Sequence, residues 1–328
     1  MPHGDILTIV SREIAETDKR TETGEVYFLT YTPNTIRQIY QDKWQVRPRK
    51  ISGQLHLPSG PGPFPAVVIL HGNFHPDELE PWFEDLIPQM IKAEIAIFVV
   101  DSFTGRGIPG TTRNPAILSR AARLVDAFMA LRFLASLPEI DEEKIGISGY
   151  ASGGTIAMIS SDTRIIDAGI ARGRGFAAHL PVYPDCQPQF RTLKFSESPM
   201  LFLVGELDDY TPAQYCFDYV ERMNEEGFNA NIKSYINAYH TWINDYKVFE
   251  CEKCATLGDC GIMYIEDNGH ESALDGKVTT QFSWEEYVEN IYQQCGRSKT
   301  TLSLNADARK ETLETTIRFF ASILKTKN

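Results

Sequence analysis

The sequence lacks an apolar run long enough to cross a bilayer, and it lacks a stripe of lysine and arginine. Its longest apolar stretches cover residues 66–70 and 95–100, far below the roughly 18 residues that a membrane span needs. The 328 residues include 32 Lys and Arg against 44 Asp and Glu, a formal net charge of -12. Such a surface repels polyanions, so we expect neither a membrane nor a nucleic acid as a partner.

The first ten residues contain neither the basic region nor the sustained apolar segment of a signal peptide. We therefore slightly favour a cytoplasmic location, while a secreted or periplasmic one stays open if a signal was removed. A hydrophobic content of 42% with 23% charged residues is typical of a globular protein. The length suits one large α/β domain with insertions.

Cysteine is also scarce, with six in the chain. Cys251, Cys254 and Cys260 lie in one short segment, and Cys295 follows further on. Their spacing matches a zinc site only loosely. Three interpretations remain open: a structural zinc, one or two disulfides, or free thiols.

Apolar runs alternate with helical patterns from about residue 50 onward. The runs are nearly continuous, which indicates parallel strands buried on both faces. We therefore predict an α/β fold with a doubly wound, mostly parallel sheet flanked by helices. The remaining segments are predicted as an N-terminal extension at residues 1–48 and, within the domain at 49–328, a cysteine-containing excursion at 244–305. The predicted strands cover residues 66–70, 95–100, 145–148, 176–180 and 200–204.

Three helices have recognisable start signals or patterns. Asn114 followed by Pro115 predicts a capped amphipathic helix that runs to about residue 137. Thr211 followed by Pro212 predicts another that ends near residue 227. The last helix is predicted at roughly residues 306–324.

The motif Gly-Tyr-Ala-Ser-Gly at residues 149–153 follows one predicted strand directly. In a nucleophile elbow, Gly-x-Ser-x-Gly, the residues two before and two after the nucleophile leave no room for side chains. Centring the motif on Ala151 places glycine on both sides. Centring it on Ser148 or Ser152 places Tyr150 at a flank instead. The nucleophile position is therefore Ala151, and the backbone N–H of Ser152 is predicted to stabilise an oxyanion.

An acid and a base follow in the order that this kind of site requires, nucleophile, acid, histidine. Asp208 follows the apolar run 200–204, and His240 follows the run 231–236. We predict that Asp208 orients His240 and that His240 is the general base. Asp209 remains an alternative acid.

The loop at residues 71–74 is predicted to supply the second oxyanion donor. Asn73 is favoured, with Phe74 as the alternative, and His71 is expected to hold the loop in place. His71 and His75 lack a third ligand, so we expect no metal. Candidates for the substrate pocket lie beside the motif loops: Phe74, Phe103, Arg106, Tyr183, Tyr210 and Trp242. Arg106, like Arg113, is a candidate partner for a substrate carboxylate.

Together these motifs resemble the dienelactone hydrolase family of the α/β-hydrolase fold, over roughly residues 50–245 and the closing helix. The resemblance implies that residues 49–328 form an α/β-hydrolase domain. It also implies a serine or cysteine nucleophile at position 151, Asp208 as the acid and His240 as the base. The implied substrate is a small-molecule carboxylic ester or lactone, with no cofactor. The segments that carry the resemblance are 68–72, 100–107, 144–154, 204–212 and 238–240.

The chain departs from that family at Ala151, for which three explanations stay open. In the first, a serine or cysteine has been replaced by alanine in an otherwise complete hydrolase, which leaves an inactive or nearly inactive variant. Alternatively, the chain is a natural, catalytically silent ligand receptor or interaction protein. In the third, Ser152 attacks through a distorted elbow. Peptidase or amidase chemistry is a further alternative, less expected because the chain encodes no propeller or large cap.

Overall fold

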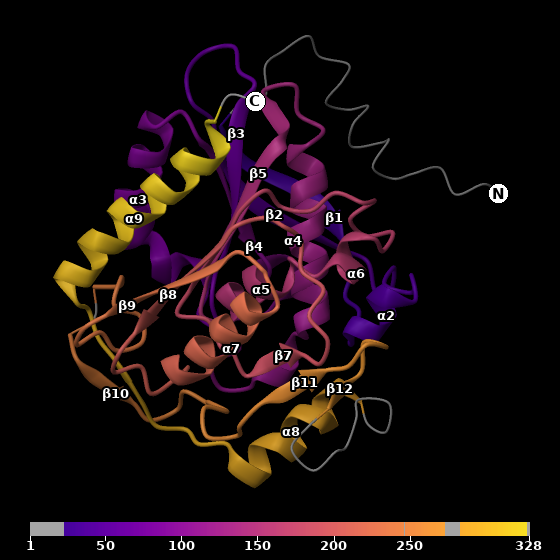
Figure 1. Cartoon of the computed structure of the whole chain (residues 1–328), viewed down its shortest axis with the longest axis vertical. Helices are drawn as coiled ribbons and strands as arrows, with labels where there is room; N and C mark the ends of the chain where they lie inside the picture. Colours follow the sequence, from indigo (N-terminus) through magenta and orange to yellow (C-terminus); the bar gives the residue numbers. More distant parts are fainter. Residues whose placement is uncertain (1–22, 246, 273–282, 327–328) are drawn as a thin grey trace.

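The computed structural model describes residues 23–245, 247–272 and 283–326. A central sheet has eight strands in the order β1-β2-β4-β3-β5-β6-β8-β9 (Figure 1). Only β2 runs against its two neighbours, and all other pairs are parallel. The predicted fold class is confirmed. The strands are β1 (Gly24–Thr30), β2 (Arg49–His56), β3 (Phe64–Leu70), β4 (Ala96–Asp101), β5 (Ile140–Tyr150), β6 (His179–Val182), β8 (Met200–Gly205) and β9 (Ala230–Tyr235).

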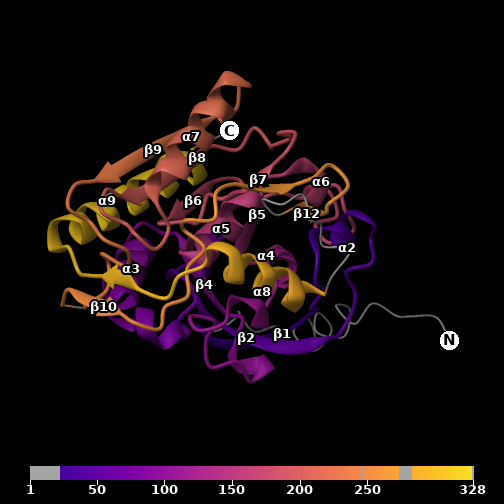
Figure 2. The same ribbon diagram turned by 90° about the horizontal axis from the view of Figure 1, so that it is seen from below.

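Helices cover both faces of this sheet, as Figures 1 and 2 show. The helices α3 (Glu80–Lys92) and α9 (Ala306–Leu324) pack on one face. The other face is covered by α2 (Ile36–Tyr40), α4 (Arg120–Leu134), α5 (Ser152–Ile159), α6 (Thr163–Ile166) and α7 (Ala213–Glu225). Short 3-10 helices lie at η1 (Pro76–Leu79), η2 (Thr104–Arg106) and η3 (Pro115–Ile117). None of the described helices is long and apolar enough to cross a bilayer.

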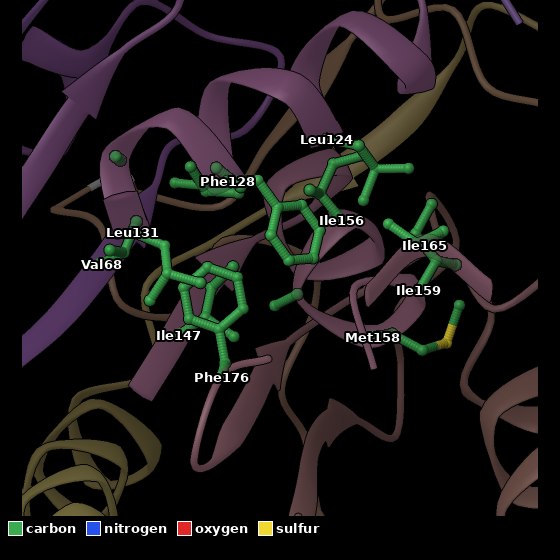
Figure 3. Close-up of a cluster of buried hydrophobic side chains, with 14 of the residues drawn as sticks. Val68, Leu124, Phe128, Leu131, Ile147, Ile156, Met158, Ile159, Ile165 and Phe176 are labelled. Carbon is green, nitrogen blue, oxygen red and sulfur yellow. The ribbon is translucent and has the colours of Figure 1, made fainter. Parts of the chain in front are cut away.

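Alternate residues of each central strand enter two separate cores. Val68 of β3 packs with Leu124 and Phe128 of α4 (Figure 3). Its neighbour Val67 belongs instead to the core that contains Trp82 of α3. Because both faces are buried, the strands need apolar residues at every position, which explains the unbroken runs in the sequence.

Two predicted helix starts and one predicted strand need correction. Asn114 caps only η3, and Ser119 then accepts the Ala122 N–H (3.0 Å) to begin α4. Leu118 between them is extended, so the predicted single helix is broken there. Helix α4 is buried almost all round rather than amphipathic. Helix α7 has Pro212 rather than Thr211 as its N-cap, and the strand predicted at 176–180 lies at His179–Val182.

The segment predicted as an N-terminal extension contributes to the main sheet. Strand β1 pairs with β2 from Gly24 to Thr30, and helix α2 packs near α4. The expectation of no signal peptide concerns residues 1–10, which lie outside the described residues.

The predicted excursion forms small elements beside the carboxyl ends of the central strands (Figure 2). Within it, β10 (Phe249–Cys251) pairs with β13 (Thr300–Leu302), and α8 (Trp284–Cys295) is a helix. Its strands β11 (Met263–Ile265) and β12 (Glu271–Ser272) form a three-stranded sheet with β7 (Pro188–Phe190), which lies outside the excursion.

All six cysteines are paired in disulfides, Cys186–Cys216, Cys251–Cys254 and Cys260–Cys295. Zinc binding and free thiols are therefore wrong, because each sulfur is bonded to another sulfur. The number of disulfides also exceeds the one or two that we considered.

Candidate active site

The sharp turn between β5 and α5 is built around Ala151. Its φ of 50° and ψ of -120° place a non-glycine residue at positive φ, which costs about 1–3 kcal/mol. The Ala151 N–H donates to the Val182 carbonyl (3.0 Å), and its own carbonyl accepts from the Thr155 N–H (3.0 Å). These bonds hold the strained turn in place.

The two glycines of the motif are required by contact. A Cβ on Gly149 would overlap the carbonyl of Gly153, and a Cβ on Gly153 would overlap the carbonyls of Leu70 and His71. Tyr150 instead points into the core, where its hydroxyl accepts a hydrogen bond from Trp82 Nε1 (2.6 Å). The steric pattern of a nucleophile elbow is therefore centred on Ala151 and not on Ser152.

Asp208 and His240 form a buried pair, each side chain 1% exposed. Asp208 Oδ2 lies 2.7 Å from His240 Nδ1. Its Oδ1 accepts hydrogen bonds from the backbone N–H groups of Tyr210 (2.9 Å) and Thr211 (2.8 Å). Asp209, the alternative acid, accepts instead from the backbone N–H (2.8 Å) and hydroxyl (3.1 Å) of Thr301.

The orientation of the His240 ring leaves its second nitrogen free. Because Nδ1 donates to Asp208, the neutral ring carries a lone pair on Nε2. This buried Nε2 has no hydrogen-bond partner in the part of the chain that the structure describes. The rings of Tyr183 and Tyr210 pack against the imidazole at centroid distances of 4.7 and 4.6 Å. The pair can therefore accept a proton at a fixed position.

The loop at residues 71–74 lies against the elbow. A Cβ on Gly72 would be 3.2 Å from the Ala151 Cβ. His71 holds the loop, because its Nδ1–H donates to the Gly72 carbonyl (2.9 Å) and its Nε2 accepts from the Ser102 N–H (3.2 Å). Burial lowers the pKa of His71 to about 3, so the ring is neutral at pH 7.

The predicted oxyanion donors flank Ala151. Ser152 is the first residue of α5, where backbone N–H groups have no partner within the helix. Asn73 lies in the loop opposite, with its side-chain amide donating to the Tyr210 hydroxyl (3.2 Å) and accepting from the Thr111 hydroxyl (3.0 Å).

Arg123 of α4 connects the loop to the elbow, a role that no motif in the sequence indicates. Its Nη1 donates to the Ser152 Oγ (2.6 Å) and the Gly72 carbonyl (3.3 Å), and its Nη2 donates to the His71 carbonyl. Burial lowers the pKa of Arg123 to about 10, so it stays cationic at pH 7. The Ser152 hydroxyl therefore accepts from a cation.

Two cavities adjoin Ala151. The smaller, of about 20 Å³, lies between the elbow and His240. The larger, of about 110 Å³, lies between the elbow and the excursion. Tyr210 lines both cavities, while Phe74 and Tyr183 line the smaller one. These three predicted pocket residues are therefore brought together beside Ala151.

The other predicted pocket residues line neither cavity, and we propose no substrate contact for them. Phe103 is buried against the His71 ring, with centroids 4.3 Å apart. Arg106 forms two 2.8 Å hydrogen bonds with the buried carboxylate of Asp126. Trp242 is fully buried and donates to the Thr312 hydroxyl (2.9 Å). Arg113 is exposed and also lies outside both cavities.

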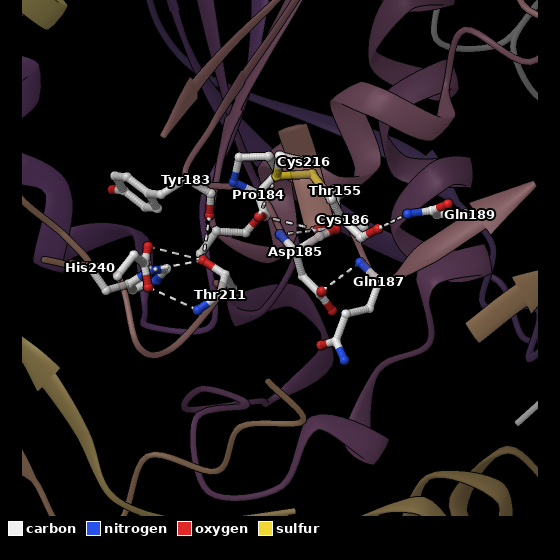
Figure 4. The surroundings of a disulfide bond; sticks show 12 residues. Thr155, Tyr183, Pro184, Asp185, Cys186, Gln187, Gln189, Thr211, Cys216 and His240 are labelled. Atoms are coloured by element: carbon white, nitrogen blue, oxygen red, sulfur yellow. Dashed lines mark hydrogen bonds and ion pairs between the residues drawn. A yellow bond between two sulfur atoms is a disulfide. The ribbon is translucent and has the colours of Figure 1, made fainter. Parts of the chain in front are cut away.

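The larger cavity is closed by residues that the sequence did not indicate. Its charged lining includes Arg120, which pairs with Glu271 of the excursion (2.6 Å), and Asp185, whose pKa burial raises. Both depend on long-range contacts that no local motif reveals. The disulfide Cys186–Cys216 joins the Asp185 loop to α7, close to His240 and Thr211 (Figure 4). The excursion contributes Ala255, Thr256, Leu257, Trp284 and Val288 to the cavity wall.

Among the described residues, no group of three His, Cys, Asp or Glu side chains is arranged to hold a metal ion. The arrangement around Ala151 consists of an oriented base, a carboxylate and backbone N–H groups. These are the parts of an acyl-transfer site apart from the attacking atom.

Known proteins share this architecture and sequence pattern. The family model described as "Dienelactone hydrolase family" matches residues 51–260. The chain is 22% identical over 201 residues to the protein named "Probable 2-oxo-3-(5-oxofuran-2-ylidene)propanoate lactonase" from Bradyrhizobium sp. This match covers 57% of this chain and 76% of that protein. It is also similar in fold to a dienelactone hydrolase-like promiscuous phosphotriesterase from metagenomic libraries. That match has a TM-score of 0.54 at 13% identity and covers 92% of this chain and 99% of the other. The chain belongs to the dienelactone hydrolase family.

Proposed function

We propose that this site binds a carboxylic ester or lactone and that its acyl-transfer chemistry needs an oxygen or sulfur at position 151. The observation that carries this proposal is the strained elbow centred on Ala151, which lines the same cavity as His240. Among the described residues, His240 Nε2 has no hydrogen-bond partner. An elbow of this kind aims its central side chain at the substrate. With alanine there, the chain has the site but no atom that forms an acyl-enzyme.

Each remaining group has a defined task once a serine or cysteine occupies position 151. His240 Nε2 takes the proton of the attacking group, while Asp208 keeps the imidazole in the required tautomer. The backbone N–H groups of Ser152 and Asn73 stabilise the tetrahedral oxyanion. His240 then returns the proton to the leaving alcohol.

The substrate is proposed to be small. The cavities of about 110 and 20 Å³ are below the roughly 300 Å³ at which drug-sized ligand pockets begin. The lactonase name of the Bradyrhizobium relative supports a lactone among the candidate substrates. Tyr210, which lines both cavities, would contact such a ligand beside Ala151.

Ser152 is a poor substitute for the missing nucleophile. Its hydroxyl accepts a hydrogen bond from the Arg123 guanidinium, and it stands one residue beyond the centre of the elbow. No imidazole bonds to it among the described contacts, so nothing takes its proton. We therefore propose that Ser152 contributes its backbone N–H alone.

A ligand receptor or interaction protein is the second candidate, and Ala151 itself favours it. Such a protein would use the hydrolase pocket without turnover. It would have no need of a base held by a carboxylate, yet Asp208 and His240 retain this geometry. We therefore place hydrolase chemistry first.

The variants Ala151→Ser and Ala151→Cys test the proposal. We expect either to raise the hydrolysis of p-nitrophenyl acetate or dihydrocoumarin by on the order of 10³-fold or more. A dipeptide p-nitroanilide tests the amidase alternative, and Ser152→Ala in the Ala151→Ser chain is the matched control. The proposal fails if both variants stay at the level of the parent while Ser152→Ala in the parent abolishes its activity. Inert variants that bind a small molecule tightly would identify a receptor.

A further inference from the structure

Three residues that line the smaller cavity each have a buried polar atom with no hydrogen-bond partner among the described residues. These atoms are His240 Nε2, Thr241 Oγ1 and Asn244 Oδ1, and all three residues line this cavity beside Ala151. The residues are 0%, 3% and 3% exposed. None of these atoms has a hydrogen-bond partner within the described part of the chain. Buried polar groups normally have such partners, so the cluster has the hydrogen-bonding capacity to hold a small polar ligand.

The size and chemistry of the cavity fit one water molecule. Its volume of about 20 Å³ exceeds the roughly 10–15 Å³ that a water requires, and a buried water typically makes two to four hydrogen bonds. His240 Nε2 is an acceptor because Nδ1 donates to Asp208. Asn244 Nδ2 donates to the Glu78 carbonyl (3.4 Å), so its Oδ1 is also an acceptor. The Thr241 hydroxyl can donate.

The backbone brings these three side chains together in one strained turn. Thr241 has a φ of 62°, a conformation that β-branched residues rarely adopt. The turn is closed by a hydrogen bond from the Asn244 N–H to the Thr241 carbonyl (2.9 Å). Strained residues of this kind cluster at functional sites. The strained turn therefore holds Thr241 and Asn244 beside His240 at the wall of the smaller cavity.

We propose that this cavity binds a water that His240 activates, so that the chain hydrolyses activated esters directly, without an acyl-enzyme. The inference rests on the proposed function, because it requires that the site accept esters. The water gives one hydrogen bond to His240 Nε2 and one to Asn244 Oδ1, and it accepts one from Thr241. Its remaining lone pair is free to attack. Thr241 and Asn244 are positioning residues, since they act through the water.

The reaction balances without any further component. The water oxygen bonds to the ester carbonyl carbon while its proton passes to His240 Nε2. The carbonyl oxygen becomes the oxyanion, which faces the loop containing Gly72 and Asn73 on the wall of the same cavity. Collapse of this intermediate breaks the bond to the alkoxide. The alkoxide takes the proton from His240, so the products are one carboxylic acid and one alcohol.

Pre-steady-state hydrolysis of p-nitrophenyl acetate by the unaltered chain tests this mechanism. We expect slow, linear product release without a burst, and an unchanged protein mass after quenching. His240→Ala should reduce the enzyme-dependent rate by on the order of 10²–10⁴-fold, the usual contribution of a general base. Asn244→Leu and Thr241→Val should each reduce it by about tenfold, the equivalent of one hydrogen bond. Asn231→Leu, at an exposed position on β9, is the control and should change nothing.

A second background separates positioning of the water from a purely structural role. In the Ala151→Ser chain, acylation uses the introduced hydroxyl and deacylation uses the water. Asn244→Leu should therefore preserve the burst and slow the steady state about tenfold, with an unchanged melting temperature. If Asn244→Leu lost the burst and also lowered the melting temperature, its role would be structural and the inference would be overturned.

Two further results separate this inference from the proposed function. A burst or acyl adduct in the unaltered chain, or full activity after His240→Ala, would overturn direct attack by water. Ester hydrolysis by Ala151→Ser would then still support the proposed function. If neither the unaltered chain nor Ala151→Ser hydrolysed esters, both the inference and the proposed function would be overturned.

Discussion

Replacing Asp208 by asparagine in the Ala151→Ser chain gives a sharp test of the acid. Asp208 Oδ1 accepts two backbone N–H groups, from Tyr210 (2.9 Å) and Thr211 (2.8 Å). In Asp208→Asn the amide oxygen must take this place, because an amide nitrogen there would face two donors. The amide NH₂ then takes the place of Oδ2, which lies 2.7 Å from His240 Nδ1.

The consequence is a change of tautomer at the base. The new N–H groups require a lone pair on His240 Nδ1, so the ring proton moves to Nε2. A protonated Nε2 cannot take the proton of the nucleophile. The equivalent change in a serine protease lowers kcat by about 10⁴-fold, which corresponds to about 5 kcal/mol of transition-state stabilisation. We expect a loss of this order in Ala151→Ser.

Asp209→Asn supplies the matched control, because the Asp209 carboxylate accepts from the Thr301 backbone N–H and hydroxyl, at 2.8 and 3.1 Å, and not from His240. Its kcat for p-nitrophenyl acetate should stay within a few-fold of the Ala151→Ser parent. Circular dichroism melts of both variants would show that they are folded. A larger loss in Asp209→Asn than in Asp208→Asn would refute the assignment of the acid.

Three further predictions concern the stability of the elbow, the excursion and the core. Gly149→Ala should destabilise the fold by several kcal/mol in urea titrations, because its Cβ would overlap a backbone carbonyl of the elbow; an unchanged midpoint would contradict the steric argument. Replacing Cys260 and Cys295 by serine opens a link between residues 35 apart, for which chain entropy predicts a loss of about 4 kcal/mol, measured by the same titration. Acid should also destabilise the protein, because burial lowers the pKa of His71 to about 3 and of His179 to about 4. The unfolded state, with histidine pKa values near 6.5, binds more protons below that pH, so each contributes a loss of about 2 kcal/mol between pH 7 and pH 5. Equal unfolding free energies at the two pH values would contradict this.

The parts of the site that local patterns encode could be predicted from the sequence. The steric need for glycine at 149 and 153 is a property of one tight turn, and it identified Ala151 as its centre. The apolar run 200–204 ends where parallel strands end, which is why Asp208 meets His240. The last helix was also predicted with the bounds that the structure has, Ala306–Leu324.

The parts that depend on distant contacts could not be predicted. Arg123 lies in a buried helix without any motif, and only the fold brings it to Ser152. The cysteine pairing requires distances between chain segments, since spacing alone allows several solutions. Strand β1, at Gly24–Thr30, is an edge strand whose partly exposed pattern lacks the continuous apolar run of the central strands. The excursion closes the larger cavity through Trp284, which no local signal connects to the elbow.

Covalent labelling of the Ala151→Ser chain tests the central claim most directly, namely that position 151 is the nucleophile position. A fluorophosphonate reacts with an activated serine, and tandem mass spectrometry distinguishes an adduct at position 151 from one at Ser152. We predict one adduct per chain, at position 151, its loss in the additional His240→Ala variant, and no adduct on the unaltered chain. An adduct on Ser152 in either chain would contradict the claim.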